Sequence, residues 1–265
     1  MAYISNREGV KADRPINFEI YVAGIDGTGD TRRTTNQDFE ASLAWSPDGT
    51  RIAFKSFRDG NDEVYVMNAD GTGQQNLTRN GAADGGPAWS PDGSAILFQS
   101  DRENEGESRF YLMNADGTDV RPLPVDPGPG HSASWSPDGQ HIAFVSNRDG
   151  QSEIYWMNAD GSNVRRLTDD PREDGYPRWS PDSQRIVHTA GSFETDRWVV
   201  VLSDLESGRS EPILNNTDSG NAAWSPDGKR LLFGRYSGYG EDGGEESRLF
   251  VFDFESRTET PVPVR

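Results

Sequence analysis

One stretch of this sequence occurs five times, and the repetition limits the folds that are open to the chain. A Trp begins each copy, at intervals of 44 to 46 residues: Trp45, Trp89, Trp135, Trp179 and Trp224. Ser-Pro-Asp follows every Trp, and Gly comes next in all copies except the fourth, which has Ser183. Nine residues after each Trp lies a Phe, or His188 in the fourth copy. Each copy is one supersecondary unit that must stack on its neighbours to bury a core.

The clearest copy, residues 133–168, has the pattern of four short strands. We expect these strands at 133–136, 141–146, 153–157 and 164–168. Pro-Asp-Gly and Asn-Ala-Asp-Gly mark two of the turns, because Pro presets φ and Gly accepts a positive φ. The apolar runs between turns suit strands and are too short for helices. Four strands in a period of this length are typical of a β-propeller blade.

We therefore predict an all-β, six-bladed β-propeller that forms a single domain over residues 1–265. The expected blades are about 1–34, 35–78, 79–123, 124–168, 169–215 and 216–265. No Trp strand precedes the first blade, and residues 258–264 resemble a fourth strand. We expect either a three-stranded first blade that lacks its innermost strand, or an N-terminally trimmed chain. The Trp and the Phe nine residues later should be buried between blades, so that Trp135→Ala costs about 3–5 kcal/mol.

Composition narrows the classes of function. Hydrophobic residues make up 32% of the chain and the mean hydropathy is −0.80, yet the apolar residues recur at fixed repeat positions. No apolar run approaches the roughly 20 residues of a membrane span. Residues 1–9 already belong to a strand and do not resemble a signal peptide. There is no cysteine, hence no disulfide. A net charge of −18 disfavours nucleic acid as a partner.

The two ends of each expected blade differ in their variability. The turns after strands one and three are nearly identical in all blades, and we interpret them as structural. We call their side of each blade the turn side. The loops after strands two and four vary, and we call theirs the loop side. Binding residues usually lie on variable loops that a rigid scaffold holds.

The candidate binding residues lie near the start of the innermost strands. Glu40, Asp84, Gly130, Asp174 and Ser219 stand five residues before the five Trp residues. We expect the following residues, in the loops that enter the innermost strands, to ring the channel mouth: Glu40, Asp84, His131, Asp174, Tyr176, Arg178 and Asn221. With a net charge of −18, little nearby would neutralise the three carboxylates, and they would attract a cation or a basic or amide-rich peptide. The alternative is that all seven are solvated loop residues.

The motifs W-S-P-D-G, I-A-F-x-S-x-R-D-G and E-I-Y-x-M-N-A-D-G resemble the repeats of the TolB-type (WD40-like) β-propeller family over nearly the whole chain. That family places an α/β domain ahead of its propeller, and the resemblance here covers the propeller only. It implies a non-enzymatic, monomeric propeller that binds a protein or peptide at its channel, in the periplasm or as a secreted protein. It is also compatible with a calcium ion in the channel.

Two other classes of function stay open. Similar repeats occur in peptidase-associated propellers and oligogalacturonate lyases, so the chain could be a carbohydrate- or peptide-processing enzyme or its accessory propeller. A ligand-free structural or designed propeller is the other class. The sequence has only three histidines and no G-x-S-x-G motif. We expect His188 to be a hydrogen-bonded core residue, and His131 alone cannot form a His-rich metal centre.

One further motif recurs, Ser-x-Arg at the end of the second strand. Its arginines are Arg7, Arg58, Arg102 and Arg148. Because the arginine returns from blade to blade, we interpret it as a device that hydrogen-bonds one blade to the next.

Overall fold

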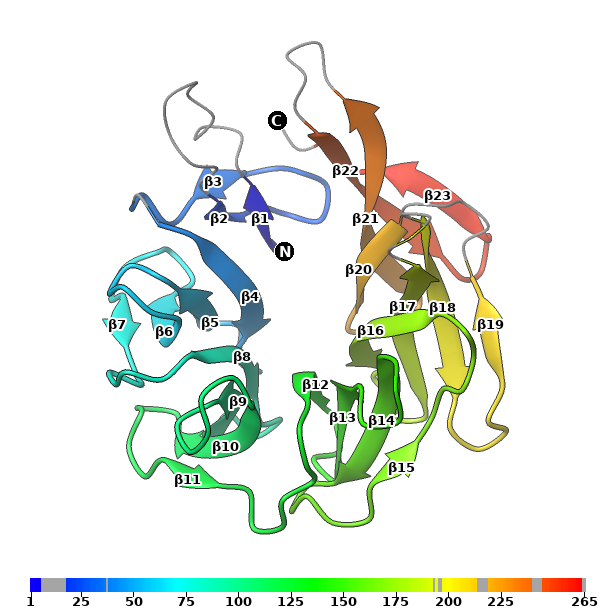
Figure 1. Ribbon diagram of the computed structural model, residues 1–265. Helices are drawn as coiled ribbons and strands as arrows, with labels where there is room; N and C mark the ends of the chain where they lie inside the picture. Colours follow the sequence, from blue (N-terminus) through cyan, green and yellow to red (C-terminus); the bar gives the residue numbers. More distant parts are fainter. Residues whose placement is uncertain are drawn as a thin grey trace. The chain divides into compact units, whose positions relative to one another are not determined.

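The computed structural model describes residues 1–5, 18–36, 38–192, 194, 197–213, 219–239 and 245–263, without the side chains of 236–239 and 245–247 (Figure 1). Within these ranges, the regular secondary structure consists of β-strands alone. None of the described residues forms a helix that could cross a membrane. The strands make six antiparallel sheets in simple chain order. The fold is therefore all-β and six-bladed, as predicted from the repeats.

The sheets, which we call blades one to six, divide between two compact units, Met1–His131 and Ser132–Pro263. In the first unit, blade one comprises β1 (Ala2–Ser5), β2 (Glu19–Val22) and β3 (Thr31–Arg32). Blade two comprises β4 (Glu40–Trp45), β5 (Arg51–Ser56), β6 (Glu63–Asn68) and β7 (Gln75–Asn76). Blade three comprises β8 (Asp84–Trp89), β9 (Ala95–Ser100), β10 (Arg109–Asn114) and β11 (Arg121–Pro122).

The strands of the remaining blades follow the same order. Blade four comprises β12 (His131–Trp135), β13 (His141–Ser146), β14 (Glu153–Asn158) and β15 (Arg165–Arg166). Blade five comprises β16 (Glu173–Trp179), β17 (Arg185–Ser192), β18 (Arg197–Asp204) and β19 (Ser210–Pro212). Blade six comprises β20 (Ser219–Trp224), β21 (Arg230–Tyr239), β22 (Glu245–Asp253) and β23 (Thr258–Pro261). Over its described residues, blade one has three strands and lacks an innermost one, as expected.

The outer strands are shorter than the sequence predicts. In blade four the outer strand is Arg165–Arg166, where we expected residues 164–168. The ladder ends there because the Thr168 side chain takes over, its Oγ1 accepting a hydrogen bond from Ile154 N at 2.9 Å. Thr34 and Thr78 do the same for Ile20 and Val64.

Four innermost strands, β4, β8, β16 and β20, contain a β-bulge that the sequence did not reveal. Three residues before each Trp the backbone turns to a positive φ of 53–58°, at Ser42, Gly86, Ser132, Tyr176 and Asn221. The ladder to the second strand shifts register there in β4, β8, β16 and β20. A bulge inserts one unpaired residue and re-aims the side chains beside it.

The predicted burial of the repeated Phe is confirmed, and the predicted burial of the repeated Trp is confirmed in two blades only. Phe54, Phe98, Phe144 and Phe233 are at most 1% exposed. Trp89 and Trp179 are buried and pack on the preceding blade, Trp89 against Ala53 and Val64. Trp45, Trp135 and Trp224 are only half-buried, so for these three the prediction of full burial was wrong. Trp45 packs on blade one, which has no innermost strand to cover it, and Trp224 lies between the partly exposed Phe254 and Arg185.

Candidate functional site

The predicted acidic residues begin strands and do not lie in loops. Glu40 and Asp84 are the first residues of β4 and β8, and Asp174 is the second residue of β16. Their backbones pair with Ser56, Ser100 and Ala190 of the second strands. All three side chains are at most 2% exposed. The expectation that they stand in the entering loops was therefore wrong, because the ladder extends past the bulge to include them.

In the first unit, the carboxylates of Glu40 and Asp84 are neutralised by arginines of their own blades. Glu40 accepts hydrogen bonds from Arg58 Nη2 at 2.8 Å and from Ser56 Oγ at 3.1 Å, and a further one from Asn36. Arg102 Nη2 lies 3.1 and 3.3 Å from the two oxygens of Asp84. Desolvation raises the pKa of Glu40, and Arg58 opposes this rise. The expectation that little nearby would neutralise these charges was wrong.

The repeated arginine therefore joins strands within one blade. Arg58 bonds to Ser56, Gln74 and Glu40 of blade two, and its guanidinium lies 4.6 Å from the centre of the Tyr65 ring. Arg102 and Arg148 lie over Tyr111 and Tyr155 in the same way, at 4.6 and 4.7 Å. The interpretation as an inter-blade device was wrong for Arg58 and Arg102, and Arg7 falls outside the described residues.

Two amide side chains are among the groups that do make inter-blade hydrogen bonds. Asn61 Nδ2 of blade two donates to Asn80 O and Ala82 O, at 3.0 and 2.7 Å, in the loop that enters blade three. Gln151 Nε2 of blade four donates to Asp170 O and Arg172 O, in the loop that enters blade five. Both amides stand sixteen residues after their Trp, a spacing that could have indicated the role.

In blade five a histidine, and not the repeated arginine, faces the buried carboxylate. Ser192 occupies the repeat position that Arg58 and Arg102 hold in their blades. His188 Nδ1 lies 3.3 Å from Asp174 Oδ1. His188 Nε2 lies 2.8 Å from Ser203 Oγ, which in turn lies 2.7 Å from Ser210 Oγ. His188 is 1% exposed and Ser203 is fully buried. The prediction that His188 is a hydrogen-bonded core residue is confirmed.

The other predicted residues are more accessible. His131 begins β12 with an exposed face, and partial desolvation lowers the pKa of its imidazole. Tyr176 is 50% exposed at the bulge of β16, and Asn221 is exposed at the bulge of β20. Arg178, on β16, is half-buried. Within the second unit the structure thus brings Tyr176, Arg178 and Asn221 onto neighbouring innermost strands. The ring of seven residues around one axis stays a prediction.

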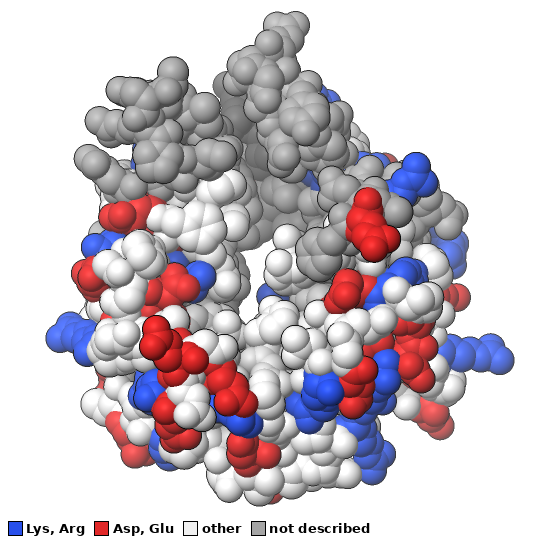
Figure 2. Space-filling model, in the orientation of Figure 1, with Lys and Arg blue, Asp and Glu red and all other residues white. Residues whose placement is uncertain are grey.

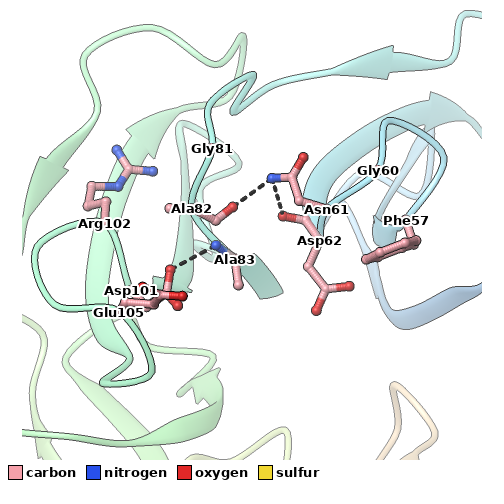
Figure 3. A pocket seen from close by; sticks show the side chains of 10 residues that line it. All are labelled: Phe57, Gly60, Asn61, Asp62, Gly81, Ala82, Ala83, Asp101, Arg102 and Glu105. Carbon is pink, nitrogen blue, oxygen red and sulfur yellow. Dashed lines mark hydrogen bonds between the residues drawn. The ribbon is translucent and has the colours of Figure 1, made fainter.

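A pocket that sequence reasoning missed lies on the loop side of blades two and three (Figure 3). Its volume is about 480 Å³, and its walls are Phe57, Gly60, Asn61, Asp62, Gly81, Ala82, Ala83, Asp101, Arg102 and Glu105. Phe57 is 46% exposed. No single motif indicated the pocket, because three separate loops supply its walls.

The charges of this pocket are predominantly negative. Asp101 accepts hydrogen bonds from Ala83 N at 2.8 Å and Gly106 N at 3.1 Å, and these bonds lower its pKa. Asp62 pairs with Lys55 Nζ at 2.9 Å, and Glu105 is exposed. The one cationic wall residue, Arg102, is committed to Asp84. On the face that Figure 2 shows, acidic and basic side chains are intermixed.

The described residues contain no group of three or more His, Asp or Glu side chains that could hold a metal ion. The calcium ion that the family resemblance suggested stays a prediction.

Solved structures with the same fold include TolB propellers. The chain is 22% identical to TolB from Acinetobacter baumannii, with a TM-score of 0.79 over 94% of this chain and 60% of that one. It is 26% identical to a putative TolB from Agrobacterium tumefaciens, with a TM-score of 0.67 over 79% of this chain and 80% of that one. The chain thus spans 60% of the length of the Acinetobacter protein.

An enzyme also shares the fold. An oligogalacturonate lyase in complex with manganese is 12% identical, with a TM-score of 0.62 over 94% of this chain and 71% of that one. At this identity the likeness is one of fold. None of the curated proteins matches the chain in sequence.

The profile of one protein family matches twice along the sequence. The family is described as the TolB beta propeller domain, and the matches cover residues 13–123 and 103–264. Together they include most of the repeats from which the six-bladed fold was predicted. The chain belongs to the TolB beta propeller domain family.

Proposed function

We propose that the chain is a non-enzymatic, monomeric, TolB-like propeller that binds a protein or peptide partner through its loop side. The observation that carries this proposal is the pocket of about 480 Å³ beside the half-exposed Phe57. Exposed aromatic side chains next to a pocket are typical of the residues that anchor a partner. Phe39 lies close by, since Phe57 N donates to Phe39 O, and it is 40% exposed.

The charge of the pocket indicates the kind of segment that it takes. Asp62, Asp101 and Glu105 line the walls, and Arg102 is already paired. An Arg or Lys side chain of the partner would enter the pocket, and an apolar neighbour would cover Phe57. We further propose, on the family resemblance, that this binding occurs in the periplasm.

The buried residues of blade five do not favour an enzyme. Asp174, His188 and Ser203 form an Asp–His–Ser series, which is the order of a hydrolytic triad. Ser203 Oγ, however, belongs to a fully buried side chain, and a nucleophile must reach its substrate. We therefore assign the series to the core of the blade.

The test compares peptide binding by three proteins, using calorimetry at low salt. The probes are short peptides with an Arg–Phe pair and matched peptides with Glu in place of Arg. The wild type should bind the Arg–Phe peptides, and Phe57→Ser with Glu105→Gln should weaken binding at least about tenfold, as hot-spot truncations do. The control, Glu206→Gln with Glu255→Gln, removes charge from turn-side loops and should bind as the wild type does.

Two outcomes would refute the proposal. One is equal binding of Arg and Glu peptides, which would show that the carboxylates do not select the ligand. The other is unchanged affinity in the Phe57 variant. Absence of peptide binding altogether would favour the ligand-free scaffold.

A further inference from the structure

We propose that Arg178, with Tyr176 and Asn221, forms a site for a carboxylate on the innermost strands of blades five and six. All three residues lie in the second unit, whereas the residues that line the pocket of blades two and three belong to the first. The inference therefore does not rest on the proposed function.

Two repeat positions on these strands carry unusual residues. The residue before each Trp is small in four blades, namely Ala44, Ala88, Ser134 and Ala223, and it is arginine only at Arg178. The bulge position carries Ser42, Gly86 and Ser132, but Tyr176 and Asn221 in blades five and six. Small residues occupy both positions in blades two to four. The larger residues are confined to two neighbouring strands, β16 and β20.

Arg178 has no acidic partner among the described residues. Among the described residues, the one hydrogen bond of its side chain runs from Nη1 to the carbonyl oxygen of Pro177, at 2.9 Å. No carboxylate of the described residues lies within ion-pair distance, although the chain carries a net charge of −18. Desolvation lowers the pKa of Arg178, and an electrostatic interaction with Tyr176 opposes this in part. A desolvated, unpaired guanidinium is costly, and its fork of donors matches a carboxylate.

The backbone of Tyr176 has an unusual conformation. Its φ is 54°, a conformation that bulky residues rarely adopt, and its side chain is 50% exposed. Burial therefore does not compensate for the strain. Strained residues of this kind gather at binding and active sites.

Two hydrogen bonds hold the neighbouring strands together at this place. Trp224 Nε1 donates to Arg178 O at 3.3 Å, and Asn221 N donates to Thr189 Oγ1 at 3.3 Å. Thr189 is the ladder partner of Gly175, which precedes Tyr176. The bulges of β16 and β20 are thus fixed side by side before any ligand arrives. The guanidinium, the phenol and the amide supply the donors that a carboxylate accepts.

The experiment measures binding of two carboxylate sources to the whole protein by calorimetry. Succinate represents a small organic acid, and an acetylated peptide with one Glu represents a partner's side chain, with its Gln counterpart as the blank. Arg178→Ala, which installs the residue of other blades, should weaken binding of the preferred probe at least about tenfold, the worth of a charge-assisted hydrogen bond. Arg178→Lys should fall in between. Arg172→Ala, which removes an arginine paired with Asp170 in the loop that enters the same blade, should bind normally.

Thermal unfolding separates a binding role from a structural one. Loss of an unpaired, desolvated charge should leave the midpoint of Arg178→Ala unchanged or higher than that of the wild type. A clear fall of the midpoint would show that Arg178 supports the fold, and would overturn the proposal. So would equal affinities of the wild type and Arg178→Ala, or no binding of either probe at about 10 mM.

Discussion

A buried carboxylate ties the first strand of blades two and three to the second strand of the same blade. Glu40 and Asp84 reach arginines that stand eighteen residues later, and each arginine also covers an aromatic ring. The carboxylates and the arginines could each be recognised in the sequence as recurring residues. Their pairing could not, because it depends on the ladder that brings residue 40 opposite residue 56.

The first prediction concerns this pair. Arg58→Ala should lower the free energy of unfolding by about 3–5 kcal/mol, since it leaves Glu40 buried without its partner. Arg58→Met combined with Glu40→Gln should recover much of the loss. Urea denaturation measures both. Arg121→Ala, which breaks an exposed pair with Asp119, is the control and should change stability by less than about 1 kcal/mol. If both arginine variants lost the same small amount, the buried pair would not be structural.

The second prediction compares two aromatic residues of blade four. Phe144 is fully buried, whereas Trp135 is half-buried. Phe144→Ala should cost about 3–5 kcal/mol, as truncations in cores do. Trp135→Ala should cost clearly less, since water already reaches part of the ring. Equal shifts of the urea midpoint in the two variants would contradict the burial seen here.

At the scale of the strand, local features could be predicted and through-space features could not. The second strand of blade four lies at His141–Ser146, as its apolar run between turn residues indicated. The bulge three residues before four of the Trp residues left no common signal, because Ser, Gly, Tyr and Asn all occupy it. Of the candidate site, the sequence placed Tyr176, Arg178 and Asn221 near one another. It could not show that Glu40, Asp84 and Asp174 are buried, because their partners come from other strands.

The third prediction concerns the bulge of β16. Tyr176→Gly and Tyr176→Ala both remove the side chain, but only Gly adopts a φ of 54° without strain. The Gly variant should therefore be more stable than the Ala variant by roughly 1 kcal/mol. Chemical denaturation of the two proteins gives the difference. An Ala variant as stable as the Gly variant would show that the positive φ carries no strain.

At the scale of the whole molecule, one set of charges recurs in the turns. The Asp of each Ser-Pro-Asp turn accepts a hydrogen bond from the preceding Ser, as Asp48 does from Ser46 Oγ at 2.6 Å. These bonds lower the pKa of Asp48 to about 2. The pKa values of Asp92 and Asp227 are lowered by the same contacts. The turns therefore depend on ionised carboxylates.

The fourth prediction follows from the sign of these shifts. A carboxyl whose pKa is lower in the folded state stabilises the fold above its unfolded pKa of about 3.8, and this stability is lost as the pH falls toward 2. Glu40 and Glu153 have raised pKa values and act in the opposite direction, but the turn aspartates outnumber them. The urea midpoint should fall between pH 4 and pH 2. Asp48→Asn should be less stable at pH 7 and should lose less on acidification. A midpoint that rises over this range would contradict the prediction.

The inter-blade bonds of Asn61 have a kinetic consequence. One of them fixes Asn80 O. Another fixes Ala82 O, and Asp101 fixes Ala83 N, so one wall of the pocket in blades two and three is held in place without a ligand (Figure 3). A segment that enters such a pocket waits for no loop to rearrange, and its encounter is limited by diffusion and charge. Partners of different affinity should then associate at similar rates and differ in residence time. Removal of the Asn61 amide would therefore slow association, even if this side chain does not itself contact the ligand.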